Sequence, residues 1–273
     1  MDDAVELQGG ISVIGYLSDI WRLRYFWTAL VRIDLRNRYR RSMIGIGWSL
    51  LHPIAMTTVL CVVFSQLFRI SIPITIYAPY LLSGLIFWNF FTSVMNQGCS
   101  CFFQGESYIR QHPAPLAIYP LRSTLGAGIH FLFGLCIVLV FVWKVNGFGN
   151  LPALLSLVPT LFLLFLFGWA LAICMGVINV LFQDSQHLIE VLLQILFYVT
   201  PIMYLPDQLP RKLVWIIKLN PLAYMIEMLR QPILYSQIPS LTTYSFAMLA
   251  VSFAAVAAIF MLMRFERRII FYL

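Results

Sequence analysis

The side chains that carry chemistry in most enzymes are few in this 273-residue chain, and their spacing does not support catalysis. The three lysines are Lys144, Lys212 and Lys218, and none stands in the Gly-Lys-Ser/Thr sequence that a phosphate-binding loop needs. The four histidines are scattered without metal-ligand spacing, and the five cysteines fall in apolar stretches, where they usually pack as small apolar residues. We therefore expect no catalytic residue, no metal site and no cofactor bound by the chain itself.

One pair of opposite charges stands out in an otherwise apolar segment. Glu227 and Arg230 are three residues apart, so they are neighbours on one side of a helix and are expected to form an ion pair. The simplest interpretation of this pair is local stabilisation of that helix. The alternative interpretation is that the pair belongs to a gate.

The composition indicates that these residues belong to a membrane-embedded chain. Hydrophobic residues make up 61% of the chain and charged residues 11%, whereas a soluble domain carries about 25% charged residues. The formal net charge of +7 could indicate nucleic acid or a membrane surface as the partner. Because the basic residues border long uncharged runs, we expect membrane lipid as the partner and no nucleic acid. A soluble globular protein is excluded.

The uncharged runs predict an all-α polytopic membrane protein with a single transmembrane domain over residues 1–273. A spanning helix needs about 20 apolar residues, and six runs approach or exceed this length. The fifth run is the shortest of the six. The predicted spans are 44–68, 80–103, 122–143, 154–180, 187–204 and 243–263.

The distribution of positive charge predicts the orientation of these spans. Twelve lysines and arginines lie on the side that holds both termini and six on the other, so both termini are expected in the cytoplasm. Residues 19–41 combine apolar residues at helical spacing, such as Trp27 and Leu30, with a basic face. This pattern is typical of a helix lying in the headgroup plane, although anchoring by positive charge alone would also account for the arginines. The basic residues of this segment are Arg32, Arg36, Arg38 and Arg40.

Two connecting segments are long enough to have structure of their own. On the cytoplasmic side, residues 105–113 are predicted to form a short helix that Pro113 and Pro115 end. This helix is either a docking site for a soluble partner or simply a polar connector between two spans. On the outer side, residues 206–235 are predicted to form two short helices at or within the outer interface, too short to span the membrane.

Nothing in the chain supplies energy for uphill transport. All acidic residues lie outside the centres of the predicted spans, which disfavours an ion-coupled carrier because such carriers need buried ionisable groups. If the protein moves a substrate uphill, the energy must therefore come from a partner.

Two segments resemble the permeases of ABC-type polysaccharide exporters. The run Asp34–Phe68 is similar to the entry to their first span, a basic amphipathic helix followed by Gly45, Trp48 and Pro53. The run Thr200–Leu234 is similar to the segment before their last span. Its Pro…Asn-Pro…Glu-x-x-Arg pattern comprises Pro201, Asn220, Pro221, Glu227 and Arg230.

The resemblance implies a homodimer joined to two copies of a separate ATPase subunit, which would bind ATP and Mg²⁺. Its cargo would be a lipid-linked, O-antigen-like polysaccharide crossing the bacterial inner membrane. Residues 19–41 would be the interface helix, 105–113 the coupling helix and 206–235 the gate at the exit. In these segments the resemblance singles out Glu106, Tyr108 and Arg110 for coupling, and Asn220, Glu227 and Arg230 for the gate.

A pore that passes sugar would be walled by aromatic rings, and 15% of the residues are aromatic. Small and polar residues also share one side of the first span, which predicts that this side faces protein or a lumen. Most aromatic residues at this depth simply face lipid or core. The predicted pore-lining residues are Ser49, His52, Met56, Trp88 and Tyr198. The alternatives are an ABC permease for a drug or small molecule, and a channel or scaffold without an ATPase.

Overall fold

The computed structural model describes residues 13–40, 42, 45, 47–67, 73–111, 114–147, 150–206, 210, 212 and 214–273, and the regular elements in this part of the chain are all helices. The expected all-α membrane architecture is confirmed. The helices are α1 (Val13–Arg22), α2 (Arg24–Arg38), α3 (Gly47–Leu67), α4 (Ile74–Gln111), α5 (Ile118–Asn146), α6 (Leu151–Leu155), α7 (Leu157–Leu181), α8 (Ser185–Val199), α9 (Val214–Leu219), α10 (Pro221–Leu234) and α11 (Leu241–Tyr272).

Four helical segments are long and apolar enough to cross a membrane. In the described residues these are Ile74–Gln111, Ile118–Val145, Leu151–Leu181 and Leu241–Glu266. Helices α3 and α8 lie alongside these long helices, but their described apolar stretches are shorter, Leu50–Val63 and Ser185–Val199. The chain is therefore a multi-pass membrane protein, and the count of six spans stays a prediction.

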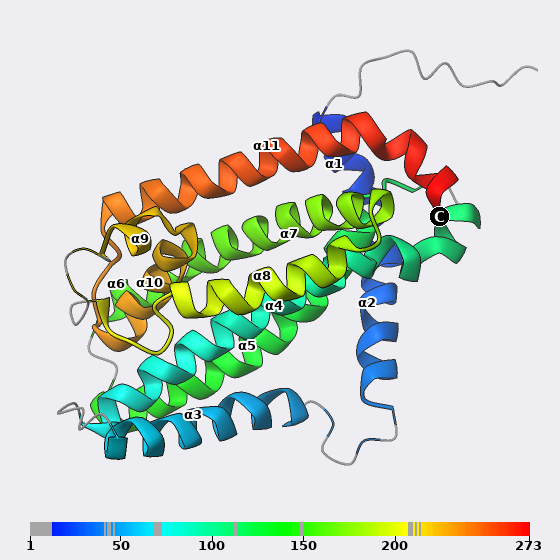
Figure 1. Cartoon of the computed structure of the whole chain (residues 1–273). Helices are drawn as coiled ribbons and strands as arrows, with labels where there is room; N and C mark the ends of the chain where they lie inside the picture. The colour runs from blue at the N-terminus through cyan, green and yellow to red at the C-terminus, as the bar shows by residue number, and fades with distance from the viewer. Residues whose placement is uncertain are drawn as a thin grey trace, which may run out of the picture.

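The short elements gather at the two ends of the bundle (Figure 1). Helix α1 and the C-terminal end of α11 lie at one end, where α2 runs across the long helices. Helices α6, α9 and α10 lie at the opposite end. The first and last described helices therefore lie at the same end of the bundle, and the side of the membrane that holds the termini stays a prediction.

Helix α4 is the centre of the bundle, because small residues let α7 approach it closely. A Cβ atom added to Gly98 would lie 2.8 Å from Cα of Ala172, and one added to Gly176 would lie 3.0 Å from the carbonyl oxygen of Gly98. The buried amide of Asn179 in α7 also donates a 2.8 Å hydrogen bond to the carbonyl of Cys99. Such small-residue contacts with an interhelical hydrogen bond are the usual means of association in membranes.

Two helix boundaries differ from the sequence-based prediction. The fifth predicted span, 187–204, ends early, because α8 stops at Val199 and Thr200 is extended, as residues preceding a proline usually are. The coupling segment is the end of α4, which continues to Gln111, and does not form a separate short helix. Residues 112 and 113 of the predicted segment lie outside the described residues.

The predicted interface helix 19–41 is divided into α1 and α2 at Leu23. Its apolar stripe packs in part on the bundle, since Leu30 is buried while Ile33 of the same stripe is 45% exposed. Trp21 and Tyr25, near the junction of α1 and α2, are also exposed. The placement of this segment in the headgroup plane stays a prediction, since periodicity shows that a helix has an apolar face but not what covers it.

Candidate functional site

A polar cleft lies between α2, α4 and α5, at the end of the bundle that α2 crosses and extending under α3. It consists of two adjoining cavities of 260 and 370 Å³. Arg38 of α2 and His130 of α5 line both cavities, so the two meet at these residues. His52 and Pro53 of α3 line the first cavity alone.

One side of α4 supplies most of the neutral polar groups of this cleft. Asn89, Ser93 and Gln97 follow one another at intervals of four residues and therefore lie on the same helix face, and Gln104 continues it. On the opposite wall Gly126 leaves open space, because a Cβ atom added there would meet no heavy atom within 4 Å. Polar residues inside an apolar bundle usually face a functional cavity, and this wall fits that rule.

Helix α2 is held over the cleft by two polar contacts to α5. Asp34 forms an ion pair with Arg122 through two hydrogen bonds to separate carboxylate oxygens. At the C-terminal end of α2, the hydroxyl of Tyr39 forms a 3.1 Å hydrogen bond with Nδ1 of His130. A bidentate pair fixes orientation as well as distance, so the position of α2 depends on Asp34.

The structure brings only part of the predicted pore lining into the cleft. His52 lies there, whereas Met56 is exposed on α3 and the side chain of Ser49 lies outside the described residues. The ring of Trp88 is buried between Phe91 and Phe197, each 5.5 Å away between centroids. Tyr198, 67% exposed on α8, points away from that core.

Trp88 is therefore a core residue within this chain, and its place in a pore stays a prediction, because aromatic content alone does not distinguish a core from a wall. The cleft residues Asn89 and Gln97 were missed by sequence reasoning, although their spacing of eight in an apolar helix was a usable signal. Such spacing places two amides on one face of the helix.

At the opposite end of the bundle, Arg230 is fully engaged by backbone groups. Its guanidinium donates hydrogen bonds to the carbonyl oxygens of Pro201 (2.6 Å), Tyr80 (3.0 Å) and Ile202 (2.9 Å), and a long one to Ser83 Oγ (3.4 Å). The guanidinium carbon also lies 3.5 Å from the centroid of the Tyr80 ring. Arg230 therefore fastens the non-helical segment after α8 to the start of α4.

The predicted Glu227–Arg230 ion pair is absent from the ion pairs of the described residues. Glu227 is exposed and accepts a 2.7 Å hydrogen bond from Gln231, while Arg230 turns inward and is 4% exposed. The physical reason is that the carbonyls freed by the break after α8 are buried and need donors. Asn220 has a related role, since it caps α10 by accepting from Leu222 and donates to Thr200 Oγ1 at 3.0 Å.

At the other end of α4, the predicted coupling residues divide between two roles. Glu106 and Arg110 form a 2.9 Å ion pair on the exposed side of the last turns of the helix. Tyr108 points toward the protein and packs edge-on against Phe26 of α2. The exposed side of the predicted coupling segment therefore carries Glu106 and Arg110, while Tyr108 connects the segment to α2, and the coupling role stays a prediction.

Beside this surface, Glu266 joins three distant parts of the chain. Its Oε1 accepts hydrogen bonds from the Tyr16 hydroxyl (2.7 Å) and from the backbone N–H of Leu116 (3.2 Å). The N–H of Ala117 in turn donates to Tyr16 Oη at 3.3 Å. Burial, and then the Glu266 carboxylate, raise the pKa of Tyr16 well above its usual range, so the hydroxyl stays a donor. We call this Tyr16–Glu266–Leu116 contact the terminal node.

Comparison with known proteins matches residues 25–234 to the ABC-2 type transporter family. This chain belongs to that family. It is 31% identical to the O-antigen export system permease protein RfbA of Klebsiella pneumoniae over 214 residues, 76% of this chain and 80% of that relative. It is 27% identical to RfbA of Myxococcus xanthus over 216 residues, 77% and 80% of the two chains. It is 23% identical to the polysialic acid transport protein KpsM of Escherichia coli over 207 residues, 76% and 80% of the two chains.

The ABC-2 segment extends from the start of α2 to the end of α10. It therefore includes the polar cleft, the exposed end of α4 and Arg230 with its carbonyl partners. Helices α1 and α11, which form the terminal node, lie outside it. Membership identifies the chain as a transporter permease, in agreement with the lack of a phosphate-binding loop.

Proposed function

We propose that this chain is the permease subunit of an ATP-driven exporter that moves a lipid-linked, O-antigen-like polysaccharide across the bacterial inner membrane. All six helices that run along the bundle cross the membrane, and both termini lie in the cytoplasm. Two copies form the pore, and two copies of a separate ATPase subunit bind ATP and Mg²⁺. The names of the relatives and the polarity of the cleft support this proposal.

The distribution of polar groups in the cleft is the observation that carries the proposal. Along α4 its walls carry the amides and hydroxyl of Asn89, Ser93, Gln97 and Gln104, which exchange hydrogen bonds with sugar hydroxyls without holding a fixed charge. The charged residues Asp34, Arg38 and Arg122 line the cavity beside α2, where the phosphate of a lipid-linked sugar would enter. An apolar drug would leave these polar groups unsatisfied, so the cleft favours a sugar over a drug.

Two glycines of α5 allow a matched test of this path. Gly126 lines the cleft and Gly128 does not, yet a Cβ atom at either position meets nothing within 4 Å. We expect Gly126→Phe to fill the cleft and abolish surface polysaccharide, and Gly128→Phe to leave it close to the wild-type level. Equal export by the two variants, at equal amounts of protein in the membrane, would contradict a path through the cleft.

The same cells test the energy supply. The wild-type chain should co-purify with its separate ATPase subunit, and the Gly126→Phe variant should retain this association because the exposed end of α4 is unchanged. A chain that exports polysaccharide without any associated ATPase would instead be a channel.

A further inference from the structure

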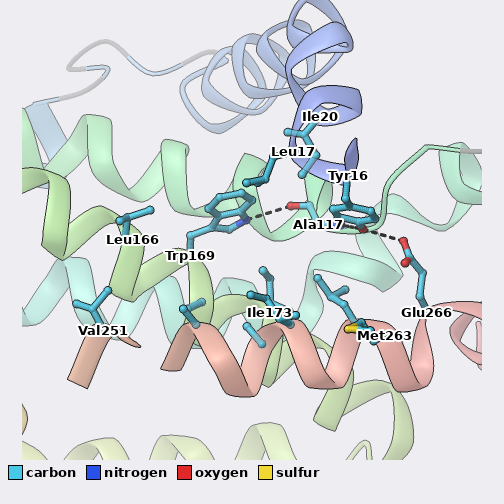
Figure 2. A pocket seen from close by; sticks show the side chains of 15 residues that line it. Tyr16, Leu17, Ile20, Ala117, Leu166, Trp169, Ile173, Val251, Met263 and Glu266 are labelled. Carbon is cyan, nitrogen blue, oxygen red and sulfur yellow. Dashed lines mark hydrogen bonds between the residues drawn. The ribbon is translucent and has the colours of Figure 1, made fainter. Parts of the chain in front are cut away.

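An apolar crevice separates α7 from α11 on the side of the bundle that α1 covers. Its volume is 180 Å³, and Figure 2 shows Trp169 of α7 and Met263 of α11 on its walls, with Leu17 and Ile20 of α1 above. Ala170 and Ala258 are small residues among its lining, one from each of the two long helices. A hydrocarbon chain therefore has room between the two helices.

The polar atoms of the crevice lie at one end and are already paired within the protein. Nε1 of Trp169 donates to the Ala117 carbonyl at 3.1 Å, and the terminal node joins Tyr16 to Glu266 (Figure 2). The rest of the lining is aliphatic or aromatic. An apolar cavity of this size stays dry and accepts apolar guests.

The crevice is continuous with the outer apolar surface of α11. Ile259 and Met263 line it and are also exposed, Met263 to 64%, and the neighbouring Phe260 is exposed as well. Because this part of α11 is one of the candidate spans, the medium at the opening is lipid hydrocarbon. Eleven residues separate Ala255 from Glu266, which is about 16 Å of helix and close to the roughly 15 Å of one leaflet.

We propose that this crevice is a binding site for one acyl chain of a membrane phospholipid from the leaflet on the side of the termini. The apolar length takes the acyl chain, and the terminal node marks the depth of the headgroup. The site is separate from the polar cleft, and the proposal does not depend on which substrate the cleft carries. Lipid binding here joins α1, α7 and α11 through a shared apolar contact.

Photocrosslinking in nanodiscs tests the site. The probe is phosphatidylethanolamine with a diazirine in one acyl chain, and the crosslinked residues are mapped by peptide sequencing. We expect crosslinks to crevice residues such as Ala170, Ile173 and Leu262. Ala255→Phe, which places a ring in the crevice, should lower these crosslinks about tenfold, equivalent to about 1.4 kcal/mol.

Val256→Phe is the matched control, because Val256 is the next residue of α11 and is exposed. It should leave the crevice crosslinks unchanged, and Ala255→Leu is the smaller substitution if the Phe variant does not fold. Equal crosslinking in the crevice-filled variant and the control would overturn the proposal. So would crosslinks confined to exposed residues such as Phe253, crosslinking by an isoprenoid-phosphate probe in place of the phospholipid, or a crosslink to a second copy of the chain.

Discussion

Replacing Arg230 by Met tests whether this side chain holds the outer end of the bundle together. Met has a similar length but no donor, so the carbonyls of Pro201, Tyr80 and Ile202 lose a charged partner. The side chain is 4% exposed, so water does not readily replace the lost donor. The variant therefore leaves the Ile202 carbonyl without a donor and weakens the hydrogen bonding of the other two carbonyls.

The magnitude follows from the number of contacts. The carbonyls of Pro201 and Tyr80 keep a neutral donor, the Tyr80 hydroxyl at 3.3 Å and the Ser83 hydroxyl at 2.9 Å, whereas Ile202 keeps none among the described polar partners. A buried acceptor left without a donor costs about 1–3 kcal/mol, and the other two carbonyls lose a charged donor but keep a neutral one. The loss of the cation–π contact with Tyr80 adds about 1–2 kcal/mol at a desolvated site. Because total stabilities are about 5–15 kcal/mol, this loss is a large fraction of the whole. Arg230→Lys should retain part of the stability, since an ammonium donates hydrogen bonds but lacks the planar fork of donors that reaches three carbonyls.

The assay is unfolding of the purified protein in mixed micelles by increasing SDS, with Glu227→Ala as the control. Glu227 contacts only Gln231 among the described polar partners and is exposed, so its loss should change the free energy of unfolding by no more than about 0.5 kcal/mol. Gly84→Ala perturbs the same contact from the other side, since its Cβ would lie 2.5 Å from Nη2 of Arg230. The reasoning fails if Arg230→Met unfolds like the wild type, or if Glu227→Ala is as harmful as Arg230→Met.

Two further predictions concern the opposite end of the bundle. Exchanging the charges in Glu106→Arg/Arg110→Glu retains the intrahelical pair within about 0.5 kcal/mol, so the fold should persist while pull-down of the ATPase and surface polysaccharide fall. Normal values for both would show that energy enters elsewhere, such as through α2. Asp34→Ala leaves Arg122 without its carboxylate and should destabilise the protein by about 1–3 kcal/mol, measured by SDS unfolding. Asp34→Ala/Arg122→Ala should cost less than Asp34→Ala alone, and strict additivity would argue against coupling of the two residues.

The sequence predicts the long helices well because a run of apolar residues needs no tertiary information to be recognised. The predicted span 243–263 lies within α11, and 122–143 lies within α5. The fate of Arg230 could not be predicted in the same way, since its partner Tyr80 lies 150 residues away. Spacing suggested Glu227 as a local partner of Arg230. In the structure Arg230 instead binds carbonyl groups of the non-helical segment after α8, those of Pro201 and Ile202.

In the candidate site, too, local sequence pattern predicts some features, and contacts between distant segments decide the others. His52 lines the cleft and comes from the side of α3 that small and polar residues mark, and Arg38 lines it too, although its segment was predicted as an interface helix. The burial of Trp88 could not be predicted, because its contact with Phe197 depends on how α8 packs on α4. Local pattern therefore identified polar helix faces, but it could not show which of those faces meet.

The length of α4 has a consequence for how the two ends of the molecule communicate. Arg110 at one end and Tyr80 near the other belong to a single helix, thirty residues apart, which is about 45 Å. A loop between them would absorb a small displacement, whereas a continuous helix passes it on as an axial shift or rotation. Under the proposed function, a displacement of Arg110 would move the Tyr80 carbonyl, which binds Arg230, as part of the same rigid helix. The non-helical segment after α8 would then be loosened or tightened directly, without rearrangement of the contacts in between.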